Sequence, residues 1–379
     1  MTFGKSLNSG DSRNLEKKPP NPAPALAGLY RVREPGDAQG IVRLNRNERQ
    51  QPLPDWFMEK LLRSIQSSTL TSYPITDGFY QLLSEHLGLS EDRILLTPGS
   101  DAAIKALYHA YVSPGDTVVI LDPSYAMYAI YGRMFQANVR AIPFDERLHL
   151  DTERLLAAMG ENTRLVMLAN PNQPTATLLD DEVLDAVIRR AHEVDALVAV
   201  DEAYFPFSGT TVLPRAIEFP NLVVTRTFSK AAGLAALRIG YAVGHPDVIG
   251  NLFKVRSVHD INSIALLAAS LLVSHPEIMA DYASQVSQGA EILTRMANDL
   301  GLRALPTHTN FMQIQVGHRC DPSRLVSKLE EKGFLVRSHT GVPCLEGCIR
   351  VTLGPPNLMV SFAHALQDAL AEITGQGAT

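Results

Sequence analysis

The most informative stretch of the chain runs from Thr225 to Tyr241 and reads TRTFSKAAGLAALRIGY. An apolar run typical of a β-strand, LVV at 222–224, precedes it, and hydroxyl residues stand just before Lys230. A lysine at the end of a strand can form an imine with an aldehyde cofactor, while Ser229 and Arg238 hold the phosphate of that cofactor. The alternative is an exposed loop lysine, which is the commoner situation, so the choice depends on the rest of the chain.

A carboxylate stands at the end of an earlier predicted strand. The run LVAVD at 197–201 is typical of a buried parallel strand, and Asp201 would lie at the edge where open α/β sheets bind ligands. Pyridoxal phosphate needs an anion at its ring nitrogen, and Asp201 fits that role. Tyr204 is close enough in sequence to reach the 3′-oxygen of the ring. An aspartate that only caps a turn is the alternative.

Further turns follow other predicted strands. In LLTPGSDAAI, residues 95–104, Ser100 and Asp101 begin a helix whose free backbone amides attract a phosphate. Asp101 is expected to contribute through its amide, because a carboxylate at this position usually caps the helix. LANPNQPTAT, residues 168–177, predicts a rigid turn that presents side-chain amides. Tyr125 in DPSYAMYAIY offers either an aromatic face for a ring or ordinary core packing.

Together these segments resemble the fold-type I pyridoxal-phosphate enzymes, specifically the class I/II aminotransferases of the histidinol-phosphate aminotransferase branch. The resemblance runs from about Leu44 to Gly354 and includes, in order, LNRNE, Tyr73-Pro74, GSDAAI, DPSYAMY, NPNQPT, DEAY, TFSKAAGLAALRIGY, THTNF and CIRVTLG. It implies that Lys230 forms the internal aldimine and later carries a proton between Cα and C4′. It also implies that the active site is completed by a second copy of the chain, because a Tyr-Pro tyrosine, here Tyr73, crosses to the neighbouring subunit's phosphate site.

The resemblance assigns the other cofactor contacts residue by residue. Asp201 would pair with the ring nitrogen, and Tyr204 and Gln173 would meet the 3′-oxygen. Tyr125 would stack on the ring. The phosphate would be held by Ser100, Asp101, Ser229 and Arg238.

Substrate contacts are expected near the C-terminus. Arg337 and Arg350 stand 13 residues apart, and Arg350 matches the arginine that aminotransferases use for the anionic end of the substrate. An arginine at the position of Arg337 helps the histidinol-phosphate enzymes to bind phosphate. Asn47 and Asn310 resemble further positions close to the substrate.

Departures from the family pattern leave the substrate open. Gln173 replaces the usual second asparagine of Asn-Asn-Pro-Thr-Gly, so it either donates from a shifted backbone or leaves the 3′-oxygen to Tyr204. His259 and His339 add titratable groups near the expected cleft, although a lone histidine is more often structural.

Transamination is the expected reaction. Decarboxylation and elimination with cyclisation are alternatives on the same fold. A non-catalytic binding module is disfavoured, because residues 1–40 are too few and too rich in proline for a DNA-binding winged helix and the sequence is not basic.

Composition agrees with an enzyme of small molecules. The chain has 379 residues, 45% of them apolar and 20% charged, with a net charge of −6, which gives no basis for binding nucleic acid or a membrane surface. No run is long and apolar enough for a transmembrane helix. The three cysteines, Cys320, Cys344 and Cys348, fit neither a zinc site nor a disulfide framework, so we expect no metal and a cytoplasmic location.

The order of predicted elements indicates an α/β fold like that of aspartate aminotransferase. Residues 1–40 predict a flexible N-terminal arm, because they are rich in Pro, Asn, Lys and Gly. Residues 51–275 predict a large cofactor-binding domain with a mainly parallel sheet flanked by helices. Residues 41–50 and 276–379 predict a smaller α+β domain, and the active site is expected between the domains and at the subunit interface.

Overall fold

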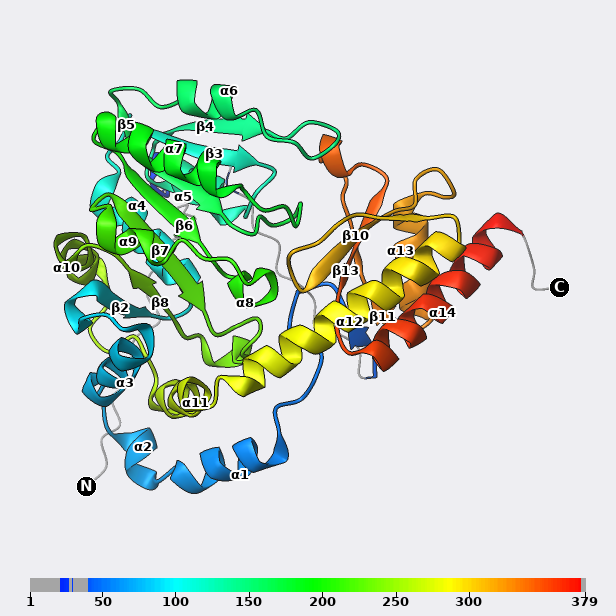
Figure 1. Ribbon diagram of the computed structural model, residues 1–379, viewed down its shortest axis with the longest axis horizontal. Coiled ribbons are helices and arrows are strands. Elements are labelled where there is room, and N and C mark those ends of the chain that lie inside the picture. Colours follow the sequence, from blue (N-terminus) through cyan, green and yellow to red (C-terminus); the bar gives the residue numbers. More distant parts are fainter. Residues whose placement is uncertain (1–20, 27–28, 30–39, 376–379) are drawn as a thin grey trace, which may run out of the picture.

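A seven-stranded sheet with the strand order β2-β8-β7-β6-β5-β3-β4 organises the larger part of the computed structural model (Figure 1). The structure describes residues 21–26, 29 and 40–375, so most of the predicted N-terminal arm and residues 376–379 lie outside the described residues. The pairs among β3 to β7 are parallel, whereas β8 is antiparallel to both β7 and β2. The predicted mainly parallel α/β sheet is therefore confirmed. Its strands are β2 (Ile94–Thr97), β3 (Thr117–Asp122), β4 (Asn138–Pro143), β5 (Thr163–Ala169), β6 (Leu197–Asp201), β7 (Leu222–Thr227) and β8 (Gly240–Val243).

Helices cover both faces of this sheet. Alternate side chains of each central strand point to opposite faces, so an apolar run such as LVAV at 197–200 is buried on both sides. One face packs against α4 (Ser100–Tyr111), α5 (Met127–Met134) and α10 (Pro246–Val255). The other packs against α6 (Thr152–Ala157), α7 (Asp181–Glu193) and α9 (Arg215–Glu218). The β2/β8 end is covered by α1 (Asp55–Ser64), α3 (Asp77–Leu87) and α11 (Ser263–Ser274), with α2 (Ser67–Thr71) beside α11.

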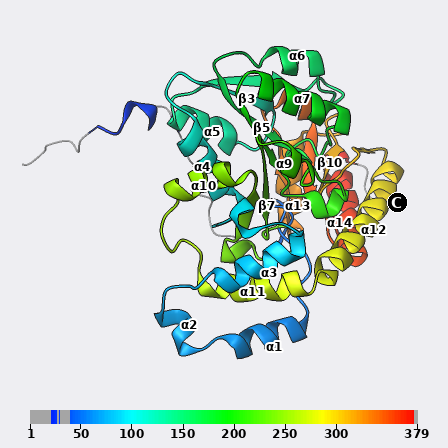
Figure 2. The ribbon, with the colours of Figure 1, turned by 60° about the vertical axis from the view of Figure 1, so that its left-hand side comes forward.

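A second, four-stranded sheet has the order β12-β13-β10-β9 and is antiparallel. Its strands are β9 (Arg303–Ala304), β10 (Phe311–Gln315), β12 (Arg337–Ser338) and β13 (Cys348–Thr352). It shares an apolar core with α12 (Glu277–Asp299), α13 (Pro322–Glu331) and α14 (Pro356–Thr374). Figures 1 and 2 show α12 running from the large sheet's helices to this second core.

The segment before α1 joins the second core although it is distant in sequence. Strand β1 (Val42–Arg43) pairs in parallel with β11 (Phe334–Leu335), and Leu44 is fully buried among the residues of α12 and α14. Residues 45–51 then cross toward the large sheet, which places Asn47 between the two cores. The short helix α8 (Phe205–Ser208) completes the described α-helices after β6.

Local signals account for several helix ends. Asn262 and Asp321 accept backbone hydrogen bonds at the starts of α11 and α13, and Pro322 occupies the first turn of α13. Gly88 ends α3 in a left-handed conformation with φ of 66°. Among the described residues no single helix is long and apolar enough to cross a membrane; α11 and α12 pass that test only as a pair bent by 76°.

Candidate active site

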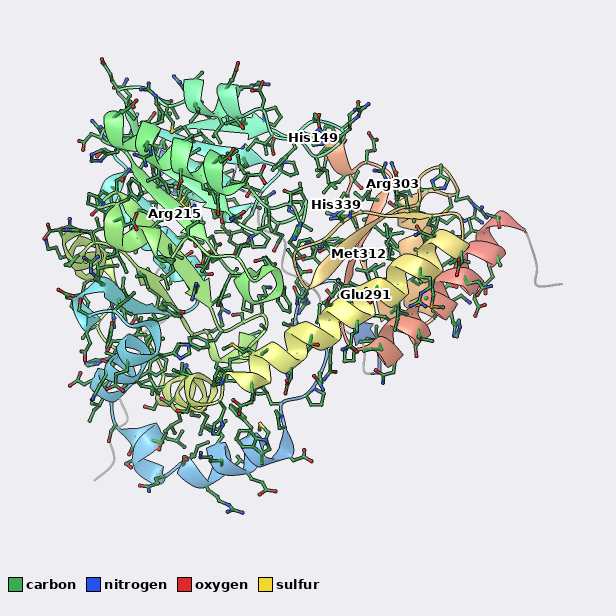
Figure 3. All side chains as sticks on the ribbon, viewed as in Figure 1. His149, Arg215, Glu291, Arg303, Met312 and His339 are labelled. Carbon is green, nitrogen blue, oxygen red and sulfur yellow. The ribbon has the colours of Figure 1, made fainter. Side chains whose placement is uncertain are left out.

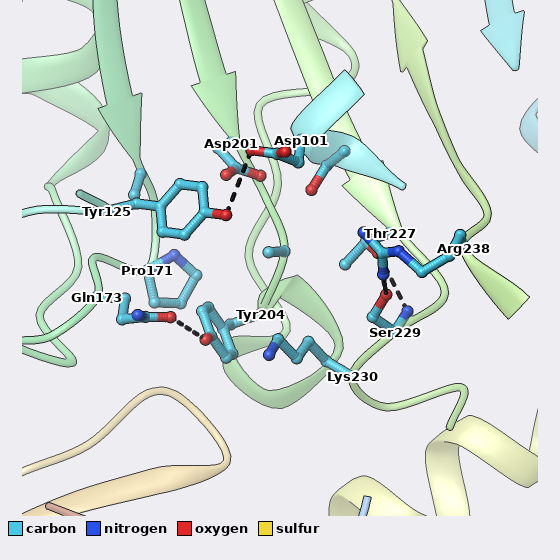
Figure 4. A pocket seen from close by; sticks show the side chains of 13 residues that line it. Asp101, Tyr125, Pro171, Gln173, Asp201, Tyr204, Thr227, Ser229, Lys230 and Arg238 are labelled. Carbon is cyan, nitrogen blue, oxygen red and sulfur yellow. Dashed lines mark hydrogen bonds between the residues drawn. The ribbon is translucent and has the colours of Figure 1, made fainter. Parts of the chain in front are cut away.

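A pocket opens at the carboxyl edge of the large sheet. Ala169, Asp201 and Thr227, the last residues of the neighbouring strands β5, β6 and β7, all line it. Ligands bind at this edge in open α/β sheets because the loops that follow the strands converge there. The pocket is lined by Ser100, Asp101, Tyr125, Ala169, Pro171, Gln173, Asp201, Ala203, Tyr204, Thr227, Ser229, Lys230 and Arg238 (Figure 4).

Asp201 forms the floor of this pocket and is 5% exposed. The hydroxyl of Tyr128 donates to its Oδ2 over 3.0 Å, and the hydroxyl of Thr225 donates to its Oδ1 over 3.1 Å. Burial raises the pKa of Asp201 to about 6, although both hydroxyls oppose the rise by stabilising the charged form. A carboxylate desolvated to this degree is best stabilised by a cation placed against it.

Lys230 follows β7 and lies across the pocket from Asp201. Its Nζ is 3.3 Å from the carbonyl oxygen of Arg46 and 5.6 Å from the centre of the Tyr204 ring. Burial, with a further contribution from the positive charge of Arg350, lowers the pKa of Lys230 to about 8. A substantial fraction of the amine is therefore neutral, and hence nucleophilic, near neutral pH.

The phosphate side of the pocket combines a helix N-terminus with an arginine. Ser100 begins the 12-residue helix α4, and Arg238 Nη1 lies 3.3 Å from Oγ of Ser229. Gly99 has a φ of 79°, and a Cβ there would come within 2.8 Å of an Arg238 Nη2 nitrogen. Gly240 lets β8 approach the same turn, because its Cβ would lie 2.7 Å from the amide nitrogen of Ser100. Glycines thus create a cradle of the kind that anions occupy.

Asp101 does more than begin the helix. Its carboxylate accepts hydrogen bonds from the hydroxyls of Tyr125, at 3.3 Å, and Tyr131, at 2.9 Å. These bonds hold the half-buried Tyr125 beside the pocket, where its ring meets Tyr128 edge-on. Tyr125 thus lines the pocket and also packs against the core of the sheet, and its stacking on a ring stays a prediction.

The amide of Gln173 reaches Tyr204 despite its extra methylene. The Tyr204 hydroxyl donates to Oε1 of Gln173 and accepts a hydrogen bond from Nδ2 of Asn47 over 3.0 Å. Asn310 donates to the carbonyl oxygen of Asn47 over 3.0 Å. Asn47, Asn310 and Gln173 are thus brought to the side of the pocket that faces the second sheet.

Arg350 comes to the same side from β13. It is 4% exposed, and its guanidinium lies 5.5 Å from the centre of the Phe311 ring. Nη2 donates to the carbonyl oxygen of Asn45 over 2.8 Å, whereas Nε has no hydrogen-bond partner in the part of the chain that the structure describes. Arg337 stands directly opposite Arg350 in the β12–β13 ladder. Burial, with a smaller contribution from the positive charge of Arg337, lowers the pKa of Arg350 to about 10.

Tyr73 and His259 lie away from this pocket. Tyr73 is 77% exposed and stacks on His259 with ring centres 4.3 Å apart. Together with Ile75 and Val258, which are 84% and 78% exposed, they form an apolar surface. His259 therefore lies away from this pocket within one chain, whereas His339 lies close enough to Arg350 for its charge to affect the pKa of His339.

Residues 39–366 match the family described as aminotransferase class I and II. The histidinol-phosphate aminotransferase of Caldanaerobacter subterraneus subsp. tengcongensis is 32% identical over 333 residues, which are 87% of this chain and 93% of that protein. The histidinol-phosphate aminotransferase 2 of Pseudomonas fluorescens is 34% identical over 345 residues, 88% of this chain and 90% of that protein. This chain belongs to the class I and II aminotransferases.

A solved aminotransferase structure has the same fold. The histidinol-phosphate aminotransferase of Sinorhizobium meliloti, in complex with pyridoxal 5′-phosphate, superimposes with a TM-score of 0.82 at 25% identity, covering 96% of this chain and 99% of that one. A Thermus thermophilus aspartate aminotransferase variant has a TM-score of 0.76 at 23% identity, over 88% and 92% of the two chains, and supports the fold. The predicted family, fold, cofactor and class of activity are confirmed, and the comparisons do not favour the decarboxylase or elimination alternatives.

The pocket of this aminotransferase suits pyridoxal phosphate. It holds a lysine with a lowered pKa, a buried carboxylate whose pKa is raised by desolvation and a glycine-lined cradle beside Arg238. Among the described residues no cluster of histidine, cysteine and carboxylate side chains could hold a metal ion.

Sequence reasoning missed two groups at the site. Tyr128 and Thr225 donate to Asp201, and neither was assigned a function from the sequence. Tyr128 lies in the first turn of α5, and its local sequence does not distinguish it from an ordinary core tyrosine. Thr225 lies opposite Asp201 in the β6–β7 register, which cannot be read from local sequence.

Proposed function

We propose that this aminotransferase moves an amino group between a donor with a phosphate-bearing or carboxylate-bearing end and a keto acid, with histidinol phosphate as the first donor to test. The observation that supports this most directly is the pair Arg350 and Arg337, directly opposed on neighbouring strands, of which Arg350 is close enough to lower the pKa of Lys230. Two guanidinium groups suit the several oxygens of a phosphate. The relatives named histidinol-phosphate aminotransferase agree with this donor.

The proposed roles follow from what each side chain can do. When bound, pyridoxal phosphate supplies an electrophilic carbon and a ring that stabilises negative charge at the substrate's Cα. Lys230 is the base that removes the Cα proton and returns it one position away, because its lowered pKa leaves a neutral amine available. Asp201 stabilises a positive charge at the ring nitrogen, and Tyr125 contributes its ring face.

Other residues bind and orient. Ser100, the amide of Asp101, Ser229 and Arg238 hold the phosphate, and Tyr204 with Gln173 meets the 3′-oxygen. Arg350 holds the anionic end of the substrate so that the Cα–H bond is the one that breaks. Asn47 and Asn310 support this side, since they connect Tyr204 to the segment that Arg350 also contacts.

We also propose a homodimer with shared active sites, in which Tyr73 completes the phosphate site of the neighbouring subunit. Its support is the exposed apolar surface around Tyr73, which water disfavours.

We further propose that the chain divides into a large domain of residues 51–275 and a small domain of residues 41–50 and 276–379. The cytoplasm stays the predicted location, and all three cysteines are free, as a reducing compartment requires.

The test begins with a visible spectrum of the protein and pyridoxal phosphate, followed by histidinol phosphate, aromatic amino acids, arginine and phosphothreonine as donors. We expect an absorbance band of the lysine-bound cofactor in the wild type, and its loss in Lys230→Ala. Conversion to the amine form of the cofactor by one donor, with a matching keto product or aldehyde, supports transamination. Release of carbon dioxide or of a β-substituent without that conversion would replace transamination by one of the alternatives.

A further inference from the structure

The second sheet carries a row of polar side chains that meets the turn containing the pocket residue Gln173. Gln313 on β10 lies directly opposite Arg350 on β13, and Arg350 lies directly opposite Arg337 on β12. Directly opposed residues share one face of a sheet, and His339 follows Arg337 by two residues. Its Nε2 lies 2.9 Å from Nε2 of Gln313, so His339 reaches across Arg350 to the far end of the row. Figure 3 shows His339 between the two parts of the molecule.

The orientation of the Gln313 amide is fixed by a backbone group. Its Nε2 lies 2.7 Å from the carbonyl oxygen of Pro174, which can only accept a hydrogen bond. A rotated amide would bring two oxygens together, so the nitrogen must face Pro174. That nitrogen has a second N–H, which points to His339. Because an amide nitrogen donates and does not accept, Nε2 of His339 is the acceptor and the imidazole proton resides on Nδ1.

The surroundings keep this imidazole neutral. Burial and, to a smaller extent, the positive charges of Arg350 and Arg337 lower the pKa of His339 to about 4. Within the described residues the bond to Gln313 is the one hydrogen bond of His339, so the Nδ1–H has no protein acceptor. An uncharged donor therefore lies beside two guanidinium groups. It can add a hydrogen bond to an anion without adding a third positive charge to the site.

We propose that His339 is a substrate-binding residue that donates Nδ1–H to the anionic end of the amino donor, and that Gln313 is the positioning residue that fixes this tautomer. The inference rests on the proposed function for the identity of the anion. Pro174 adjoins Gln173, which accepts the hydrogen bond of Tyr204. The turn that meets the cofactor therefore also orients His339, and one rigid segment sets the contacts to both reactants.

The tautomer is tested without turnover. Side-chain ¹⁵N spectra of the cofactor-loaded wild type at a pH of about 7.5 should show His339 neutral and protonated on Nδ1, with the assignment made by comparison with His339→Asn. Gln313→Leu should shift the population toward the Nε2–H form that free imidazole side chains prefer. A wild-type His339 that is protonated on Nε2, or on both nitrogens, would overturn the proposal.

Binding of the anion is tested with variants of similar shape. His339→Asn retains an N–H near the position of Nδ1, whereas His339→Phe removes it. We expect His339→Phe to raise KM for the anionic donor about tenfold, as for one hydrogen bond to a charged group, with kcat within about twofold of the wild type. His339→Asn should have a KM for the donor close to that of the wild type. The double variant Gln313→Leu/His339→Phe should raise this KM no more than His339→Phe alone does.

The control is His318→Phe, because His318 lies in the same part of the chain and bonds the carbonyl oxygen of Gly301 away from the pocket. Equal KM values for wild type, His339→Phe and His339→Asn would remove His339 from substrate binding. Calorimetric binding of inorganic phosphate separates this outcome from failure of the proposed function. If no donor is transaminated and His339→Phe still weakens phosphate binding about tenfold, the reaction assignment fails and the anion contact stands.

Discussion

Replacing Asp201 by asparagine should stabilise the cofactor-free protein while abolishing its activity. Burial raises the pKa of Asp201 from its ordinary value of 3.8 to about 6. At about 1.4 kcal/mol per pKa unit, this difference corresponds to about 3 kcal/mol. The folded pKa lies above the unfolded one, so the folded state binds more protons between a pH of about 4 and 6, and the free energy of unfolding falls as the pH rises through this window.

Asparagine carries no charge at any pH and avoids this loss. Both hydroxyls that contact Asp201, those of Tyr128 and Thr225, can rotate to donate or accept, so the amide keeps its partners. We therefore expect the free energy of unfolding of cofactor-free Asp201→Asn to exceed that of the wild type by about 3 kcal/mol at a pH of about 7.5. The difference should vanish near a pH of about 4. Turnover should fall by orders of magnitude, since no anion remains to meet the ring nitrogen.

Urea unfolding at both pH values, at one protein concentration, measures the difference. Glu202→Gln is the control, because the neighbouring Glu202 is also buried but forms an ion pair of 2.9 Å with Arg226. Loss of that charge leaves Arg226 uncompensated and should destabilise the protein by about 3–5 kcal/mol at the higher pH. If Asp201→Asn is destabilised in the same way, or if its advantage is independent of pH, Asp201 is not held as a desolvated carboxylate.

Three further predictions concern the pocket. The rate at which the cofactor-free protein binds pyridoxal phosphate should rise with pH, with a midpoint near pH 8, because Lys230 loses its proton there. Stopped-flow absorbance measures this rate, and a midpoint near pH 10.5 would contradict the prediction. Arg350→Lys should raise KM for the donor by about tenfold or more, because an ammonium group cannot form the two parallel hydrogen bonds of a guanidinium; an unchanged KM would place the anion site elsewhere. Gly99→Ala should weaken cofactor binding, measured by fluorescence titration, because its Cβ would collide with Arg238. Gly88 also has a positive φ but open space around its Cβ, so Gly88→Ala should lower stability without changing cofactor affinity. Equal cofactor affinity in both variants would argue against the cradle.

The parts of the site that the sequence predicted belong to local patterns. A buried strand that ends in a charged residue places that residue at the carboxyl edge of a parallel sheet, and this rule located Asp201 and the hydroxyls before Lys230. Ser100 was located by the start of a helix after Pro-Gly. Each pattern spans a few residues, so no knowledge of distant contacts was needed.

Contacts between distant segments were harder to predict. His259 was expected near the substrate cleft because its loop departs from the family pattern, yet within one chain it stacks on Tyr73 at the surface. The sequence alone gave no reason to assign Gln313 a role. It is instead 1% exposed, since the turn that contains Pro174 covers it. Burial of a polar residue is decided by what packs against it, and local sequence does not contain that information.

The apolar residues of the second sheet explain why Gln313 and Arg350 meet. Met312 and Ile314 on β10 lie opposite Val351 and Ile349 on β13, and all four belong to the core shared with α12 and α14. Since successive side chains of a strand alternate, the residues between them must face away from this core, where Gln313 meets Pro174 and Arg350 meets Asn45. A slip of one residue in this register would turn Arg350 into the apolar core and expose its neighbours. The free energy that fixes the polar side of the site is therefore supplied by the packing of its opposite face.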